Sequence, residues 1–365
     1  MQGAAPAVAA AAIESGDPLP GTRGFAGRLP DGRLVRDVLG RYPCFTDAAD
    51  PTDWSADPRD LVEPVALPAG TVRGPDGEPA PVWTLPDPAP AEDDERAIAA
   101  LADAIAATTD AVATDGLAIA FSGGLDSALL AARLDAPLYV AGFPDSHDVA
   151  AARSAADLLD RDLTVVEVTH DDLERAVPEL ARAIDRTNAM AVQIALPLYL
   201  TAERVAADGF DRLAVGQGAD ELFGGYAKVA KAPDDPRVDA DTVRGATREV
   251  IRTLPDQLER DVLALRAAGV EPAAPLLDDR VVAAALRLPG HLLVSEPGAD
   301  ARRKVALREA SARWLPAAIA EREKKAVQYG SLVARELDRL ARRAGYKRRM
   351  DDHVTQYVRS LVEAA

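Results

Sequence analysis

Leu117-Ala-Ile-Ala-Phe-Ser122-Gly123-Gly124-Leu125-Asp126-Ser127 is the most informative stretch of this sequence. A short apolar run ends in Ser-Gly-Gly and a helical pattern follows at once, which predicts a strand, a tight turn and a helix N-terminus. Backbone N–H groups and the positive end of the helix dipole meet there, so the turn suits a phosphate. Asp126 adds a carboxylate for a Mg²⁺ that bridges phosphates. The alternative is an ordinary βα turn in which the glycines only relieve strain.

Apolar strands alternate with helical patterns on either side of that turn. The alternation predicts an α/β fold with a doubly wound parallel sheet, whose ligands gather at the carboxyl ends of the strands. Ser122, Gly142 and Gly216 fall there. The expected strands are 117–121, 137–143, 163–168 and 212–215, and the expected helices are 93–113, 147–159, 171–184 and 189–207. Beyond residue 230 we expect only helices, forming a C-terminal α-helical subdomain, at 240–268, 278–288, 300–312 and 331–362.

Three domains are expected along the chain. Residues 1–20 are rich in Ala, Pro and Gly and are predicted to be disordered. Residues 21–88 are broken into short segments by Gly, Pro and Asp, with hairpin candidates at 29–35 and 72–78, and they predict a small antiparallel β unit. Residues 89–365 are expected to form the α/β domain with its helical subdomain.

The composition is acidic, with a net charge of -17 over 365 residues and few lysines beside the arginines. Such a surface is typical of halophilic proteins, because salt screens the self-repulsion. It argues against broad nucleic-acid binding, although the C-terminal part offers a local basic patch. No run approaches the roughly 18 apolar residues that cross a bilayer. With no basic region at its Ala-rich start, the chain is predicted to be cytoplasmic, without membrane contact.

Two motifs carry a resemblance to a known family. The Walker and G-x-G-x-x-G patterns are absent. Ser122-Gly-Gly-Leu-Asp-Ser127 instead resembles the pyrophosphate-binding loop of the ATP pyrophosphatase (PP-loop) superfamily, whose fold is adenine nucleotide alpha hydrolase-like. Gly216-Gln-Gly-Ala-Asp220-Glu-Leu-Phe-Gly-Gly-Tyr226 is similar to the second signature of the asparagine synthetase synthetase domain.

The resemblance implies ATP and Mg²⁺ as cofactors and gives roles to single residues. Asp126 and Asp220 match metal-binding positions, with a helix N-cap as the alternative for Asp220. Lys304 matches a lysine that meets the departing pyrophosphate, and Lys325, after Lys324, is a second candidate; a solvated surface charge is the alternative for each. The positions that match nucleotide-binding ones are Ala120, Ser122, Gly123, Gly124, Leu125, Asp126, Ser127, Ala141, Gly142, Gly216 and Gly218.

Two departures from the family pattern concern the acyl acceptor. A later stretch resembles the family's Gly-Leu-Glu-Ala-Arg-Val-Pro-Phe-Leu-Asp and retains Glu271, an implied catalytic position, with Pro275 and Asp278. Its arginine, which supports the acceptor end, is replaced by Ala273. At the implied catalytic position Gln217 the family usually has a Glu that accepts a proton from ammonia, whereas an amide is no general base. ATP binding is expected to survive these changes, but amide formation needs another base or another nucleophile.

The N-terminal β unit resembles the last strands of the family's glutaminase domain. The first half of that domain, with its N-terminal cysteine nucleophile, has no counterpart here, and position 2 is Gln. Cys44, the only cysteine, is expected to be a packed thiol. The resemblance therefore implies a stand-alone, archaeal-like form that does not hydrolyse glutamine and takes free ammonia or uses an external ammonia donor.

Three functional hypotheses follow. The first is an AMP-forming amidoligase that adenylates a small carboxylate, aspartate by default, for attack by ammonia. The second, motivated by Gln217 and Ala273, is a related ligase with another acceptor, either another carboxylate or a tRNA. The third is a non-catalytic nucleotide-binding protein. A homodimer is possible in each case.

Overall fold

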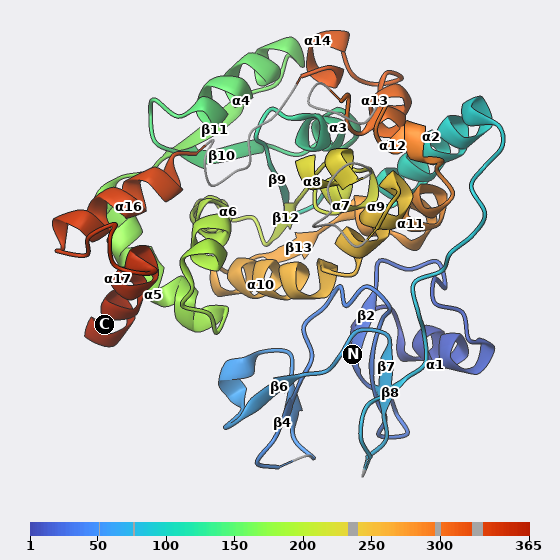
Figure 1. Cartoon of the computed structure of the whole chain (residues 1–365), viewed down its shortest axis with the longest axis horizontal. Coiled ribbons are helices and arrows are strands. Elements are labelled where there is room, and N and C mark those ends of the chain that lie inside the picture. Colours follow the sequence, from blue (N-terminus) through green and yellow to red (C-terminus); the bar gives the residue numbers. More distant parts are fainter. Residues whose placement is uncertain (51, 76, 233–239, 296–300, 323–330) are drawn as a thin grey trace. The chain divides into compact units, whose positions relative to one another are not determined.

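The computed structural model describes residues 1–365 except 51, 76, 233–239, 296–300 and 323–330 (Figure 1). Two compact units can be distinguished by their internal contacts. The first unit comprises Met1–Val112, Gly216–Glu259 and Ala274–Ala320, and the second comprises Ala113–Val215, Arg260–Ala273 and Glu321–Ala365. This division differs from the predicted boundaries at residues 20 and 88, because the N-terminal strands and many later helices share one unit.

The second unit contains a five-stranded sheet of order β11-β10-β9-β12-β13 in which all pairs are parallel. Buried apolar residues such as Leu117 and Ile119 fill its central strand. The α/β fold with a parallel sheet is therefore confirmed. The strands are β9 (Leu117–Ala120), β10 (Leu138–Gly142), β11 (Leu163–Glu167), β12 (Arg212–Ala214) and β13 (Glu271–Ala273).

The strand β13 corrects the expectation that strands end before residue 230. Glu271, Pro272 and Ala273 pair in parallel with Arg212, Leu213 and Ala214 of β12. The segment is only three residues long and contains a proline, which is tolerated at the edge of a sheet but disguises a strand in the sequence.

The helices at 147–158, 170–183 and 189–207 follow the predicted positions closely, because their N-termini carry recognisable caps, whereas the helix expected at 331–362 is divided into two, at 333–343 and 353–364. Ser146, Thr169 and Asn188 each accept a hydrogen bond from the first turn of the helix that follows. The helices are α3 (Leu125–Arg133), α4 (His147–Leu158), α5 (His170–Ala183), α6 (Ala189–Ala207), α16 (Val333–Arg343) and α17 (His353–Ala364). Both α16 and α17 pack against α5 and α6.

The N-terminal part of the first unit is the predicted antiparallel β structure, arranged as two small sheets. One sheet has the order β1-β2-β3-β7-β8 and the other β5-β4-β6. The strands are β1 (Gln2–Gly3), β2 (Phe25–Arg28), β3 (Leu34–Arg36), β4 (Phe45–Asp47), β5 (Trp54–Ser55), β6 (Pro64–Ala66), β7 (Thr71–Arg73) and β8 (Ala80–Pro81). The hairpins β2–β3 and β7–β8 correspond to the two predicted candidates.

The first 20 residues are not disordered as predicted, since they form β1 and the helix α1 (Pro6–Ser15). Ala9 and Ala12 of this helix are buried in a cluster with Phe25 and Trp83. The repeated alanines make this segment resemble a disordered, low-complexity sequence, but their small side chains let the helix approach the sheet closely. Gly16, with a φ of 68°, ends the helix in the left-handed conformation that glycine accepts easily.

The other regular elements that the structure describes in the first unit are helices and 3₁₀ turns. They include α2 (Asp94–Asp110), α7 (Ala219–Leu222), α8 (Ala227–Lys231), α9 (Val243–Ile251), α11 (Asp279–Leu286), α12 (Gly290–Leu293), α13 (Val305–Ser311) and α14 (Ala317–Ala320), with the 3₁₀ turns η1 (Pro58–Asp60) and η3 (Pro275–Leu277). The helix α10 (Leu254–Ala267) crosses from the first unit to the second. α2 packs against α11 and α13. No helix in the described part of the chain is long and apolar enough to span a membrane.

Candidate active site

The Ser-Gly-Gly turn of the second unit connects β9 to α3 as predicted. The Ser127 hydroxyl closes the turn, because it accepts a hydrogen bond from Ser122 N at 3.2 Å and donates to the Gly124 carbonyl at 3.3 Å. Gly124 is the N-cap of α3 and supplies no side chain to the first turn of the helix. The backbone N–H groups of that turn are therefore not capped by a side chain, which is the arrangement that an anion uses.

Gly123 must be glycine for two physical reasons. Its φ of 69° lies in the left-handed region, and a methyl group at this position would lie 2.4 Å from the Ala151 carbonyl oxygen of α4. The loop backbone therefore lies directly against α4, at a distance that no side chain permits. This close approach favours a dedicated loop over a turn whose glycines only relieve strain.

Small residues occupy the carboxyl ends of the neighbouring strands. Ala120 ends β9, and Ala141 and Gly142 end β10 beside it. A methyl group at Gly142 would lie 2.7 Å from Ser146 Oγ, so this strand end is also closely packed. Asp126 lies in the first turn of α3 and is only 7% exposed. These predicted positions are brought together at one edge of the sheet.

Arg322 is a residue at this loop that sequence reasoning missed. Its guanidinium donates hydrogen bonds to the Ala151 carbonyl at 2.9 Å and to Ser154 Oγ at 3.1 Å. Its Nη1 also lies 3.5 Å from the Gly123 carbonyl. The only signal in the sequence is its position just before Lys324 and Lys325, and both of these lysines lie outside the described residues.

Glu271 does not lie beside the loop. It pairs with Arg212, which pairs with Leu117, so it stands at the amino edge of the parallel sheet, opposite the edge from which Ser122 follows. Its carboxylate is exposed and ion-paired with Arg266 at 2.8 Å. Ala273, at the other end of β13, is the residue on the carboxyl edge. The structure therefore gives no support to a catalytic role for Glu271.

The second signature belongs to the first unit, where it forms the turn into α7. Gly218 is the N-cap of α7 with a φ of 90°, so the proposed N-cap role of Asp220 is wrong. Asp220 lies in the first turn of this helix, and its Oδ1 forms an ion pair with Lys304 Nζ at a distance of 2.7 Å. Gln217 precedes this N-cap and is half-buried. The signature therefore presents the carboxylate of Asp220 to a lysine far away in sequence.

Lys304 is buried, with only 7% of its surface exposed, so the alternative of a solvated surface charge is wrong for this residue. It is the N-cap of α13 with φ 58° and ψ 38°, a left-handed conformation that is uncommon for a lysine. Such strained residues concentrate at functional sites. Gly225 leaves room for the ion pair, because a methyl group there would lie 2.1 Å from Asp220 Oδ1 and 2.5 Å from Lys304 Cε.

Glu221 is a second buried acid in the same turn. Its Oε1 accepts a hydrogen bond from the Tyr226 hydroxyl at 2.6 Å. Burial raises the pKa of Glu221, although this hydrogen bond acts in the opposite direction. The turn thus holds one carboxylate paired with a lysine and one buried beside it.

The second unit thus has a parallel α/β sheet whose central strand ends in a turn suited to a phosphate. Residues 97–239 and 234–363 match the family model described as asparagine synthase. The chain belongs to the asparagine synthase family.

Curated relatives agree with this assignment. A protein of Methanocaldococcus jannaschii, named after the glutamine-hydrolysing asparagine synthetases, is 31% identical in an alignment of 281 positions that covers 68% of this chain and 52% of the relative. Asparagine synthetase B of Escherichia coli is 27% identical over 57% of this chain and 40% of its own length. The chain therefore spans about half or less of the relatives that it matches.

Proposed function

We propose that this chain is an ATP-dependent, AMP-forming amidoligase. It adenylates a small carboxylate, with aspartate as the default, and passes the acyl group to ammonia while AMP and pyrophosphate leave. The observation that carries the proposal is the Ser122–Ser127 turn, which is closed by Ser127 and packed against α4 through Gly123, in a chain of this family. The names of the relatives support aspartate and asparagine as substrate and product.

The residues present fit Mg²⁺ and ATP. Mg²⁺ prefers carboxylate oxygens together with phosphate oxygens. Asp126 lies in the first turn after the phosphate loop, and the side chain of Asp220 is 47% exposed. When bound, Mg²⁺ neutralises the charge that develops on the phosphates. We propose each of Asp126 and Asp220 as a candidate carboxylate ligand for Mg²⁺.

Lys304 supplies fixed positive charge for the leaving pyrophosphate. A buried ammonium that is already oriented needs little reorganisation when negative charge develops, and the low local dielectric strengthens its effect. Its ion pair with Asp220 holds the side chain in one place. We therefore propose that Lys304 stabilises the departing anion.

The ammonia is proposed to come from solution or from an external donor. Cys44, the only cysteine, is fully buried, and burial raises its pKa to about 11. A neutral, buried thiol is a poor nucleophile. This chain therefore lacks a cysteine suited to glutamine hydrolysis.

A ligase with another acceptor is the second candidate function. Gln217 offers no general base, and Ala273 places a small apolar side chain at the carboxyl edge of the sheet. Both residues stand where the family pattern has a charged side chain for the acceptor chemistry. An acceptor that needs neither charge would fit these two positions better than aspartate and ammonia.

The test is to measure AMP and pyrophosphate release from ATP-Mg²⁺ in concentrated KCl, with aspartate, with and without ammonium. Stoichiometric AMP, pyrophosphate and asparagine are expected. ATP binding without turnover on aspartate would favour the second candidate, and a panel of carboxylates and tRNA would then be screened. The nucleotide site would be refuted if the wild type did not bind ATP and Asp126→Asn behaved in the same way.

A further inference from the structure

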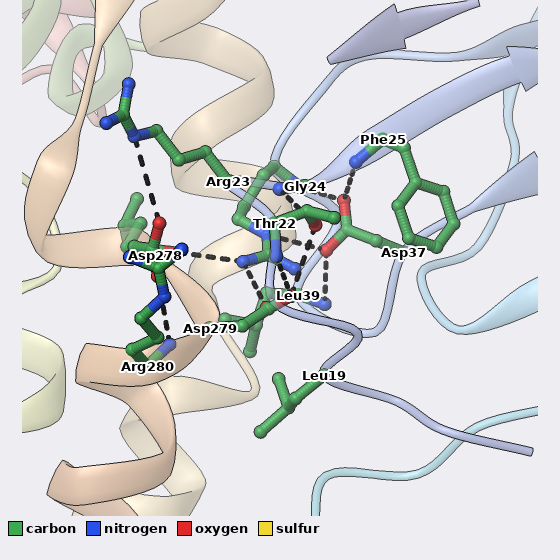
Figure 2. A network of polar contacts seen from close by, with 12 residues as sticks. Leu19, Thr22, Arg23, Gly24, Phe25, Asp37, Leu39, Asp278, Asp279 and Arg280 are labelled. Carbon is green, nitrogen blue, oxygen red and sulfur yellow. Dashed lines mark hydrogen bonds and ion pairs between the residues drawn. The ribbon is translucent and has the colours of Figure 1, made fainter. Parts of the chain in front are cut away.

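A buried network of ionic contacts connects the N-terminal β structure with the segment that enters α11, both within the first unit (Figure 2). Its centre is Arg41, whose side chain is 2% exposed and lies between the buried carboxylates of Asp37 and Asp279. The distances from Arg41 to these carboxylates are 2.9 Å from Nε to Asp37 Oδ1 and 2.7 Å from Nη1 to Asp279 Oδ1. Neither acid is used in the proposed ligase reaction.

The same guanidinium also fixes the backbone. Arg41 Nη1 donates to the Leu277 carbonyl at 2.7 Å. On the other side of Asp279, Oδ2 accepts from the Thr22 backbone N–H at 2.7 Å and from its hydroxyl at 3.1 Å. Contacts from two separate places in the β structure therefore hold residues 277–279. Figure 2 shows how Thr22, Asp37 and Asp279 converge there.

The charges in the network are mutually dependent. Burial disfavours the charged form of Arg41, but Asp37 and Asp279 outweigh it and raise the pKa of the guanidinium. Arg41 therefore stays charged at any pH at which the protein is folded. Removing it would leave two carboxylates buried without their common counter-ion, which is strongly unfavourable.

The held segment lies directly against the second signature. A methyl group at Gly218 would lie 2.5 Å from Leu277 Cδ2, so the Leu277 side chain covers the backbone at the N-cap of α7. Asp220, two residues further on, carries the ion pair with Lys304. A displacement of Leu277 would thus be passed to Gly218 and to the first turn of α7 through direct packing.

We propose that Arg41 is a positioning residue for the ligase site: by fixing Leu277 and Asp279, the N-terminal β structure sets the second signature and its Asp220–Lys304 pair. This inference rests on the proposed function only for its effect on turnover. It gives the β structure, which resembles part of a glutaminase, a role that needs no glutamine chemistry.

The chain offers a matched control in Arg73. This arginine is also buried in the β structure, but the hydrogen bond that the structure describes for its side chain goes from Nε to the Gly77 carbonyl at 2.9 Å, within the β7–β8 connection. Both Arg41→Met and Arg73→Met remove a buried guanidinium from the same sheet region. Arg73→Met therefore controls for the loss of a buried guanidinium from the β structure, without the ion pairs that Arg41 makes with Asp37 and Asp279.

The experiment is native-state hydrogen exchange of the full chain, read by mass spectrometry in peptides that cover 216–225 and 274–282. Arg41→Met is expected to accelerate exchange in both peptides by at least about tenfold, because the local opening free energy falls, whereas Arg73→Met leaves both unchanged. Unchanged exchange in 216–225 for Arg41→Met would overturn the proposal. If that variant does not fold, Arg41→Lys, which keeps the charge but loses the fork that reaches several acceptors, is measured in the same way.

Pyrophosphate release then separates this inference from the proposed function. In Arg41→Met, kcat/KM for ATP is expected to fall about 10- to 100-fold, since a displacement of the order of 1 Å at a catalytic group has that effect, while Arg73→Met stays at the wild-type value. Equal kinetic constants in the wild type and Arg41→Met would refute the effect on catalysis. A wild-type chain without any turnover would refute the proposed ligase, and the exchange data alone would then decide on the positioning role.

Discussion

Replacing Gly225 by alanine tests whether the Asp220–Lys304 pair belongs to the catalytic machinery. The added methyl group would lie 2.1 Å from Asp220 Oδ1, 2.7 Å from Asp220 Cα and 2.5 Å from Lys304 Cε. Ordinary contacts of this kind begin at 3.4 Å, so the Asp220 oxygen would have to withdraw by 1.3 Å. The contact with Asp220 Cα shows that the backbone of the turn has to move as well.

The expected consequence is large for catalysis and moderate for stability. A displacement of about 1 Å at a catalytic group lowers the rate about 100-fold. Overpacking of a buried site costs about 1–3 kcal/mol of unfolding free energy. We therefore expect Gly225→Ala to fold, to lose about two orders of magnitude in kcat/KM for ATP, and to bind Mg²⁺ more weakly than the wild type.

The assay is pyrophosphate release as a function of ATP-Mg²⁺ concentration, combined with denaturant unfolding. Gly74→Ala is the matched control, because a methyl group there meets no atom within 4 Å and the residue needs no positive φ. That variant should equal the wild type in both measurements. Wild-type kinetic constants for a folded Gly225→Ala would refute a role for the Asp220–Lys304 pair in turnover.

Three further predictions test other residues. Asp126→Asn should weaken ATP-Mg²⁺ binding at least about tenfold in calorimetry, because a carboxylate ligand is lost; unchanged affinity would remove Asp126 from the metal site. Gln217→Glu should raise ammonium-dependent AMP formation at least about tenfold if the missing base limits the rate, and no gain would point to another nucleophile. The pKa of about 11 at Cys44 means that the folded chain binds the thiol proton more tightly than the unfolded chain. The unfolding free energy of the chain should therefore fall by about 3 kcal/mol in total as the pH rises from below about 9 to above about 11, and Cys44→Ala should lack this fall.

The parallel sheet could be predicted because its signals are local. An apolar run marks each preceding strand or helix, and Ser146, Thr169 or Asn188 then marks the start of the next helix. The structure forms the N-cap at each of these three residues. β13 was missed since its pairing with β12 comes from a segment about 60 residues later along the chain, where a proline hides the pattern. Long-range pairing of this kind leaves little trace in local periodicity.

The order of the N-terminus was missed for a different reason. An Ala-rich segment has low side-chain entropy to lose and a small surface, so its folding depends on what it packs against. Here Ala9 and Ala12 meet Phe25 and Trp83, which come from later strands. Composition alone cannot reveal such a partner.

The predictions for Glu271 and Lys304 show how far the sequence alone can define the site. Glu271 matched a motif position, yet parallel register places it at the amino edge of the sheet, and a motif match carries no information about register. Lys304 matched by position too, but its burial, its left-handed backbone and its contact with Asp220 depend on packing between elements far apart in sequence.

Among the described non-glycine residues with positive φ, only Lys304 and Leu332 are not aspartates, the residue type that tolerates this region more readily. This left-handed conformation of Lys304 beside a carboxylate is more easily explained by a requirement for its ammonium group at one fixed place than by a contribution to folding stability. For this reason the proposed chemistry should be tested first on the Asp220–Lys304 pair and not on Glu271.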